Sequence, residues 1–421
     1  MKQKVSGYVV FLAVVAAIGG ILFGYDTAVI SGTTEVVKAQ FHLGTGGEGW
    51  YVGCALIGSI IGVLLAGMMS DFLGRKKTML ISAVLFSVSA IGCAVSADFT
   101  QLVIFRMIGG FGIGIVSVVS PVYISEVSPA EVRGTMVSLY QLFITIGFLL
   151  AYLVNFLILK GTTMAEYWRP MLGAEAVPDL LFLVLIFFIP ESPRWLQVRG
   201  QRQDNSEAWA ALREPGILVA VLIGSAIAIL GQFMGVNAVL YYGPKIFADA
   251  GFQDPLFSTV LVGVVNMLTT VIALLIIDKV GRKQLVWWGV GGMIFCLLMI
   301  GLYFLPVTNL PTWFMLTFFL LYVFCTAISL SAVVFVLLSE MYPNRVRGLA
   351  MSIAGFALWI GTYLIGHLTP WMQETLTPAG TFFHFAFMCL PYLWIMYKYV
   401  PDTTGKTLEE IEDYWKQRGR K

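Results

Sequence analysis

Two charged residues, Asp26 and Arg106, lie inside long apolar stretches of the chain. An ionisable side chain at the centre of a bilayer costs about 2.5 to 3.5 kcal/mol on insertion scales, so such residues are candidates for a function. Both are expected about 4 to 6 residues below the same membrane surface, a depth that permits a direct ion pair. Because Arg keeps its proton at ordinary pH whereas Asp can gain one, protonation of Asp26 would release Arg106 and act as a switch. The alternative is a static ion pair that joins two helices.

Two further acids, Glu175 and Asp179, stand near the start of the sixth apolar stretch. The sequence gives no sharp outer boundary there. For Asp179, a solvated position at the membrane interface is at least as well supported as a buried one.

The uncharged polar residues within the apolar stretches are amides, phenols and an indole. They are Gln141, Gln232, Asn237, Tyr241, Tyr242, Asn266 and Trp359. Uncharged donors and acceptors beside an aromatic platform suit a neutral polyhydroxy ligand better than an ion. Each residue taken alone is equally well explained by hydrogen bonds between membrane helices. Glycines at positions 231 and 235 would let the segment that carries Gln232 and Asn237 bend or unwind.

The cysteines and histidines do not indicate a catalytic or metal site. All five cysteines fall inside apolar stretches without metal-ligand spacing, and the three histidines are scattered. The sequence holds no Ser/His/Asp or His/Glu cluster. The sequence therefore predicts a protein that binds no metal, uses no cofactor and is not an enzyme.

The elements that carry these residues are expected to be membrane-spanning helices. Hydrophobic residues make up 58% of the chain and charged residues 12%, which is about half the charged share of a soluble domain. Runs of about 20 apolar residues, the length of a membrane-spanning helix, recur along the chain. They lie near 8–30, 50–70, 78–97, 100–122, 135–158 and 169–189, and again near 216–243, 256–277, 285–305, 313–338, 348–371 and 380–400.

The chain is internally repeated. The heptad at 71–77, which reads DFLGRKK, is answered at 278–284 by DKVGRKQ, and each copy lies in a short polar gap between apolar runs. The predicted fold is an all-α membrane protein with twelve transmembrane helices in two pseudo-symmetric six-helix bundles. The expected segments are a first bundle at 1–195, a short cytosolic linker at 196–214, a second bundle at 215–402 and a cytosolic tail at 403–421.

The distribution of Lys and Arg predicts the orientation, since cytoplasmic loops collect positive charge. With both termini in the cytoplasm, most of the 26 basic residues fall inside, and Lys38, Lys160, Arg169 and Lys245 fall outside. The net charge of +2 is therefore a topological signal and gives no reason to expect a nucleic-acid partner. The lipid bilayer is the expected environment, in the cell (inner) membrane.

An ordered series of motifs runs nearly from end to end. It comprises 19–32, both Gly-Arg-Lys loops, 106–114, Glu126 with Arg133, 190–196, 232–242, Glu340 with Arg347, and 401–411. With these motifs the chain resembles the sugar porter family of the major facilitator superfamily, most closely its bacterial proton-coupled pentose and hexose symporters. The resemblance implies two bundles that rock about a central sugar site, in a protein that works as a monomer.

The resemblance also implies roles for individual residues. Asp26 would accept the coupling proton beside Arg106, and in facilitative members an Asn usually stands at the position of Asp26. The sugar contacts would include Gln141, Gln232, Asn237, Tyr241, Tyr242, Asn266, Phe335 and Trp359. The cytoplasmic gate would comprise Asp71, Arg75, Glu126, Arg133, Glu191, Arg194, Asp278, Arg282, Glu340 and Arg347. Asp71 is expected to cap the helix that follows it, and Arg75 to reach either Glu126 or the carbonyl ends of neighbouring helices.

The chain departs from the family pattern in four places. Gly231 replaces the first of two consecutive glutamines, Phe335 stands where a Trp is usual, and Leu358 stands where an amide is common. These changes make the expected pocket less polar. The multi-helix cytosolic domain of the family is reduced to a linker of about 20 residues, which can still join the two halves.

The sequence thus favours a proton-coupled symporter of a monosaccharide such as a pentose or hexose. The alternatives within the class are a facilitative sugar uniporter and a symporter of a polyol such as inositol. A non-transporting sugar sensor is a rival from another class, and an integral-membrane enzyme comes last.

Overall fold

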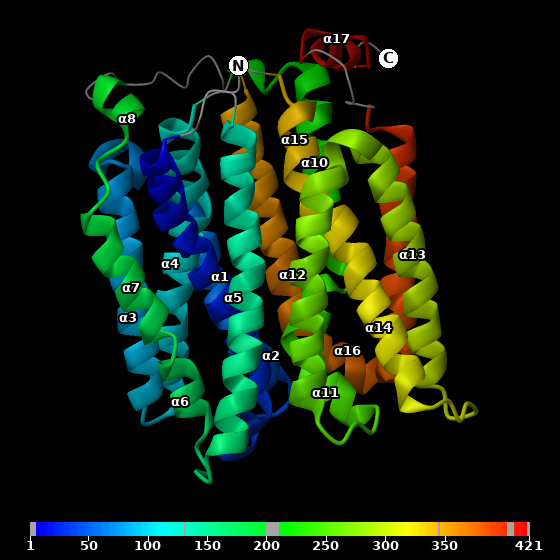
Figure 1. The fold of residues 1–421 in the computed structure, drawn as a ribbon. Helices are drawn as coiled ribbons and strands as arrows, with labels where there is room; N and C mark the ends of the chain where they lie inside the picture. Colours follow the sequence, from blue (N-terminus) through cyan, green and yellow to red (C-terminus); the bar gives the residue numbers. More distant parts are fainter. Residues whose placement is uncertain (1–5, 130–131, 199–209, 344–345, 402–407, 419–421) are drawn as a thin grey trace. The chain divides into compact units, whose positions relative to one another are not determined.

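The computed structural model describes residues 6–129, 132–198, 210–343, 346–401 and 408–418, and every regular element in these ranges is helical. Figure 1 shows the helices in sequence colours. Within these ranges, eleven helical segments are long and apolar enough to cross a membrane. The chain divides into two compact units, which are described separately.

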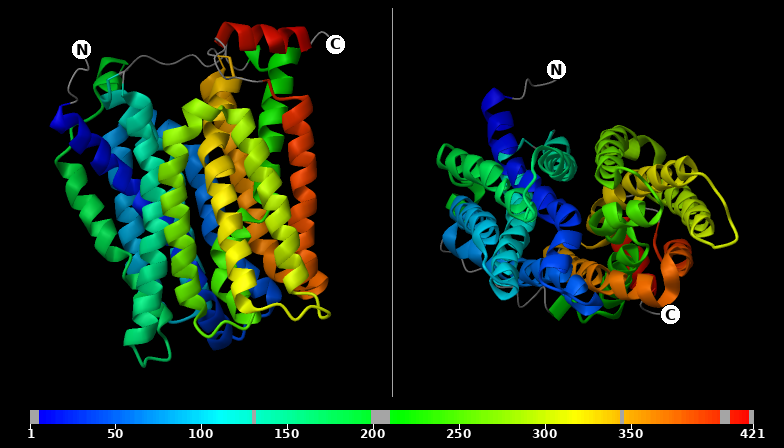
Figure 2. Two further views of the ribbon diagram at one scale, coloured as in Figure 1. Left: turned by 45° about the vertical axis from the view of Figure 1, so that its right-hand side comes forward. Right: turned by 90° about the horizontal axis from the view of Figure 1, so that it is seen from below.

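Unit 1 holds residues 1–201 together with 240–249 and 253–267. Its helices are α1 (Gly7–Gln40), α2 (Thr45–Leu73), α3 (Arg75–Val95), α4 (Phe99–Val127), α5 (Arg133–Gly161), α6 (Trp168–Gly173), α7 (Ala176–Phe187) and α8 (Pro193–Val198). α1 packs against α4 and α5, and α4 also packs against α2 and α3. Figure 2 shows these helices end-on in its right-hand view. Asp26 and Arg106 lie on α1 and α4, so the first unit carries the charged pair at a helix crossing.

Unit 2 holds residues 202–239, 250–252 and 268–421. Its helices are α10 (Pro215–Phe233), α13 (Arg282–Tyr303), α14 (Thr312–Thr326), the π-helical turn η1 (Ala327–Ser331), α15 (Ala332–Met341), α16 (Arg347–Lys398) and α17 (Leu408–Arg418). Two helices, α11 (Val236–Asp249) and α12 (Pro255–Val280), contribute residues to both units. Within unit 2, α16 packs against α10 and α13.

Local sequence explains where several helices begin. Ser6 precedes α1 and its hydroxyl accepts a hydrogen bond from the Tyr8 amide at 3.3 Å. Asp98 precedes α4 and accepts one from the Gln101 amide at 2.9 Å. Such caps satisfy amides that have no partner inside the helix, and the long apolar runs then continue as helix because lipid offers the backbone no other partner.

The helices differ from the twelve predicted spans in two places, and an interruption of the backbone explains each difference. α16 covers both of the last two predicted spans, and it is broken at Thr377, whose φ of 65° and ψ of 164° are not helical. The seventh predicted span is divided into α10 and α11 at Gly235, whose φ is +88°. The expectation that this segment would bend or unwind is therefore confirmed.

The predicted all-α membrane fold is confirmed, while the boundaries of the four predicted segments stay predictions. Most of the linker, at 199–209, lies outside the described residues, as do 402–407, which span the boundary between the second bundle and the tail. α17 lies across one end of unit 2 in Figure 1. It is held there by the Trp415 indole, which donates a hydrogen bond to the Met341 carbonyl at 3.0 Å.

Candidate functional site

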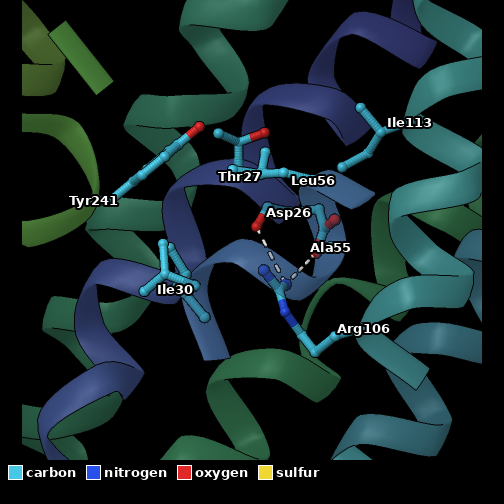
Figure 3. Close-up of a pocket in the computed structure, with 9 residues that line it drawn as sticks. Asp26, Thr27, Ile30, Ala55, Leu56, Arg106, Ile113 and Tyr241 are labelled. Carbon is cyan, nitrogen blue, oxygen red and sulfur yellow. Dashed lines mark hydrogen bonds and ion pairs between the residues drawn. The ribbon is translucent and has the colours of Figure 1, made fainter. Parts of the chain in front are cut away.

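Asp26 and Arg106 form an ion pair inside unit 1. One guanidinium nitrogen of Arg106, Nη1, donates to the Asp26 carboxylate, and it lies 3.4 Å from the Asp26 main-chain oxygen. Each residue is only 2% exposed. Figure 3 shows the Arg106 side chain pointing at Asp26 across a small pocket. The contact expected from their matched depths is therefore present.

Close packing of α1 against α5 fixes the position of Asp26. A Cβ atom on Gly24 would lie 2.0 Å from the Ile144 carbonyl, so only glycine allows the two backbones to approach this closely. One turn beyond Asp26, the Asn155 side-chain amide donates to the Val29 carbonyl at 3.1 Å. α1 is thus clamped on both sides of the carboxylate.

The pocket offers one face of this ion pair to a ligand or a proton. Its polar lining is Asp26, Thr27, Arg106 and Tyr241, and its apolar lining is Ile30, Val52, Ala55, Leu56 and Ile113. Among the residues that the structure describes, no protein partner bonds Asp26 Oδ2 or Arg106 Nε. Asp26 therefore keeps one carboxylate oxygen that can accept a proton while the other holds Arg106.

A second polar cluster lies in unit 2, at the break between α10 and α11. The Asn237 amide donates to Gln232 Oε1 at 2.5 Å. The Thr362 hydroxyl, from α16, lies 3.1 Å from the same oxygen. The single Thr362 hydroxyl proton is shared between this oxygen and the Leu358 carbonyl, which lies 2.9 Å away. With its oxygen accepting from Asn237, the Gln232 side chain is oriented to use its amide nitrogen as a donor. This arrangement suits the hydroxyl oxygens of a neutral polyol.

The other residues predicted to contact a sugar are divided between the two units. Tyr241 and Tyr242 of α11 and Asn266 of α12 belong to unit 1 and are at most 8% exposed, and Gln141 of α5 is partly exposed there. Trp359 of α16 is 7% exposed in unit 2, one turn from Thr362. The side chain of Phe335 lies outside the described part of the chain. The structure thus gathers Tyr241 with the ion pair and Gln232 with Asn237.

Three of the predicted gate residues of unit 1, Asp71, Arg75 and Glu126, form a charged cluster between α2, α3 and α4. Arg75 makes two parallel hydrogen bonds to the Glu126 carboxylate, each 3.0 Å long, and a third to Asp71 Oδ1 at 3.0 Å. A bidentate arrangement of this kind is the strong form of an Arg–carboxylate pair. The expected contact between Arg75 and Glu126 is therefore present.

The cap of α3 is not the one predicted. We expected Asp71 to cap this helix, but Glu191 takes that position, since its Oε1 accepts hydrogen bonds from the amides of Arg75 at 2.8 Å and Lys76 at 3.0 Å. Asp71 precedes the end of α2 and its carboxylate pairs with Arg75 instead. The expectation was wrong because a carboxylate brought in by the segment after α7 approaches the helix end along its axis, where the amides point.

Unit 2 repeats part of this cluster. The Arg282 guanidinium contacts Glu340 Oε1 at 3.0 Å, as Arg75 contacts Glu126 in unit 1. Arg347 is half-buried and lies 3.4 Å from the Tyr342 carbonyl. Arg133 and Arg194 are exposed in unit 1. The side chain of Asp278 lies outside the described residues.

Three features of the interior escaped the sequence analysis. Asp179 was given a solvated position as a strong alternative, and this is wrong because it is fully buried. The role of Thr362 was missed, although its spacing of three from Trp359 places both on one helix face. The buried Glu48, which binds both Lys38 and Lys245, was also missed, and its position in the first turn of an apolar helix was the available signal.

Comparison with known proteins places the chain in a family. The family model described as "Sugar (and other) transporter" matches residues 12–217 and 203–415. The D-xylose-proton symporter of Escherichia coli (strain K12) is 37% identical, with 100% of this chain and 98% of that protein covered. The arabinose-proton symporter of Bacillus subtilis (strain 168) is 36% identical, with 98% and 96% covered.

Solved structures agree with this placement. A structure of the xylose transporter XylE from E. coli, described as inward open, has a TM-score of 0.85 at 36% identity and covers 97% of this chain and 100% of its own. A partially occluded inward open structure of the same transporter has a TM-score of 0.84 at 35% identity, with 96% and 100% covered. The chain is a multi-pass membrane protein, and it belongs to the sugar transporter family of the major facilitator superfamily, as the sequence predicted.

Proposed function

We propose that this protein is a proton-coupled symporter of a monosaccharide that works by alternating access in the cell membrane. The observation that carries the proposal is the buried Asp26–Arg106 pair, in which Asp26 Oδ2 has no partner among the described residues. An ionised Asp26 holds Arg106, and a protonated Asp26 releases it. The relatives named as proton symporters of D-xylose and arabinose support this assignment.

The sugar would be bound by uncharged groups. Gln232 and Asn237 form a hydrogen-bonded amide pair. Thr362 lies within hydrogen-bond distance of the Gln232 side-chain oxygen, and Trp359 is on the same helix as Thr362. A pyranose offers hydroxyls to the amides and an apolar face to an aromatic ring. We assign Gln141, Tyr241, Tyr242, Asn266 and Phe335 as further contacts with the sugar.

The charged clusters would act as the cytoplasmic gate. In this proposal the termini lie in the cytoplasm, so that Arg75 with Glu126 and Arg282 with Glu340 lie on that side. The remaining members would be Asp71, Arg133, Glu191, Arg194, Asp278 and Arg347. The protein would need no cofactor besides the proton, and it would work as a monomer with its sugar and the bilayer as its only partners.

Transport assays in proteoliposomes test the function. Purified protein is reconstituted, and uptake of radiolabelled xylose, arabinose, glucose and inositol is measured with and without an inward proton gradient. We expect concentrative uptake of at least one monosaccharide, its loss in Asp26→Asn, and retention of counterflow in that variant. Asp254→Asn, which alters a partly exposed carboxylate paired with Lys160, is the matched control.

Other outcomes would redirect the assignment. Uptake that never exceeds equilibrium in the wild type would indicate a uniporter, and preference for inositol would indicate a polyol symporter. Binding without counterflow would indicate a sensor. For the site itself, Gln232→Ala and Asn237→Ala should each weaken sugar binding by about 3- to 10-fold, the effect of one lost hydrogen bond. Unaltered affinity in both would place the sugar elsewhere.

A further inference from the structure

A carboxyl group outside the ion pair, that of Asp179, lies fully buried in unit 1. Asp179 stands in the first turn of α7 and is 0% exposed, and Glu175, one turn earlier, is 3% exposed. Within the described residues, no protein group hydrogen-bonds either oxygen of Asp179 or Oε1 of Glu175. A carboxylate that is buried without a partner is strongly unfavourable in its charged form.

Among the residues that the structure describes, Arg106 is the only positively charged group that interacts electrostatically with this pair of acids. α7 packs against α1 and α3. Glu175 interacts electrostatically with Tyr25 and Asp26 of α1, Cys93 of α3, Arg106 of α4 and Asp179 itself, whereas Asp179 interacts with Tyr25 and Asp26. Arg106 is already engaged by Asp26. The positive charge of this site is thus balanced before either acid of α7 is counted.

The balance of charges indicates which of these buried carboxyl groups carry protons. Three ionised carboxylates around one guanidinium would leave a net charge of −2 in a site removed from solvent. With Asp26 ionised and paired to Arg106, the site is neutral only if the acids of α7 carry protons. Of the two acids, Asp179 is the stronger candidate for a protonated carboxyl group. Neither of its oxygens has a hydrogen-bond partner among the described residues, and it is the more deeply buried.

Protonation of Asp26 reverses this balance. Arg106 cannot lose its proton, so it would become an unpaired buried cation when Asp26 is neutral. The negative charge of Asp26, which opposes ionisation of Asp179, is then removed, so an ionised Asp179 becomes less unfavourable. Loss of the proton from Asp179 restores neutrality at the cost of one O–H bond.

We propose that Asp179 is a second proton-carrying residue of the transport cycle, which holds a proton while Asp26 is ionised and releases it when Asp26 becomes protonated. One O–H bond forms at Asp26 with a proton from the outer solution, and one breaks at Asp179 with its proton passing to water on the cytoplasmic side. Transfer of the Asp26 proton to Asp179 resets the site. One proton therefore crosses in each cycle, and two carboxyls carry it in turn.

This inference rests on the proposed function, and its test separates the two. Proton-driven accumulation and counterflow are compared in wild type, Asp26→Asn, Asp179→Asn, Asp179→Glu and the Asp254→Asn control. Asp179→Asn keeps the size and polarity of the neutral acid but cannot release a proton. We expect loss of accumulation with retained counterflow in this variant, and recovery of accumulation in Asp179→Glu.

A spectroscopic measurement tests the protonated acid directly. Infrared difference spectra of the purified protein report the C=O stretch of protonated carboxylic acids. At a pH at which Asp26 is ionised, we expect a band in wild type that is missing in Asp179→Asn and shifts when the wild type is exchanged into deuterated water. The band should also be lost in Asp26→Asn, because a neutral side chain at position 26 favours the ionised form of Asp179. Glu175 is expected to contribute a band of its own, so if Asp179→Asn fails to fold, the loss of one band in Asp26→Asn still tests the proposal.

The outcomes are distinct. If Asp179→Asn accumulates sugar like the wild type, or if the wild type lacks the band, the role of Asp179 is refuted while the symport function stands. If the wild type itself shows no proton-driven accumulation, the proposed function fails and the inference fails with it.

Discussion

Lys245 of α11 donates a hydrogen bond to Glu48 of α2 at 2.7 Å, although 197 residues separate the two in the chain. The opposite oxygen of Glu48 accepts from Lys38, at the end of α1. The Glu48 side chain is 0% exposed, whereas the two lysines are 22% and 33% exposed. A single buried carboxylate thus joins three helices, and it fixes residues 240–249 of the second half of the sequence within unit 1.

We expect this bridge to contribute measurably to stability. Lys245→Met and Glu48→Gln should each lower the free energy of unfolding by about 1 to 3 kcal/mol, the range for hydrogen bonds to charged groups. All five cysteines are buried, so a thiol-reactive dye reports thermal unfolding in detergent. The double variant should cost less than the sum of the single ones, with a coupling of about 0.5 to 3 kcal/mol.

The exposed pair of Lys160 and Asp254 is the control for the bridge. Their side chains are 59% and 35% exposed, and removal of such a pair should change stability by at most about 1 kcal/mol. Additive losses in the Lys245 and Glu48 variants would show that the two side chains do not act together.

Glu191 should hold the first turn of α3 in place. Glu191→Ala removes an acceptor that serves the amides of Arg75 and Lys76, and it should destabilise that turn by about 1 kcal/mol. Hydrogen exchange measured by mass spectrometry should then be faster at residues 75–78 than in the wild type. Arg194→Ala, an exposed change in the same segment, is the control. Equal protection in both variants would show that Glu191 is not needed as a cap.

The sequence predicts those features that depend on neighbours along the chain or on the depth of a residue in the membrane. The apolar runs, the break near Gly235 and the approach of Asp26 to Arg106 follow from hydrophobicity, glycine and matched depth. By contrast, the cap of α3 comes from Glu191, more than a hundred residues away, and no local pattern selects it over the nearer Asp71. The burial of Asp179 depends on how α1 and α3 cover α7, which the composition of α7 alone does not reveal.

Thr362 should tune sugar affinity through Gln232. Its hydroxyl is within hydrogen-bond distance of the Gln232 side-chain oxygen, so Thr362→Val leaves that amide less constrained. We expect sugar binding to weaken by about 3- to 10-fold, equivalent to one neutral hydrogen bond, while Thr362→Ser retains affinity. Isothermal titration calorimetry checks both variants. Equal affinity in the Val and Ser variants would separate Thr362 from the site.

Two glycines of the broken helix pair α10 and α11 should respond in opposite ways to alanine. At Gly231 the added Cβ meets Tyr392 only at 3.8 Å, an ordinary contact, and the backbone is helical. Gly231→Ala should therefore stabilise the protein by about 0.4 to 1 kcal/mol, since the unfolded chain loses freedom. At Gly235 the φ of +88° disfavours any side chain, and a Cβ would lie 2.4 Å from Phe385.

Gly235→Ala should accordingly destabilise the protein by more than about 1 to 2 kcal/mol, the cost of the left-handed conformation alone. It should also weaken sugar binding, because Gln232 and Asn237 lie on opposite sides of this break and their hydrogen bond depends on its angle. Gly231→Ala should leave that hydrogen bond intact. Thermal unfolding and calorimetric sugar titration of the two variants provide the comparison. If Gly235→Ala binds sugar as well as Gly231→Ala does, the geometry of the break is not what orients the amide pair.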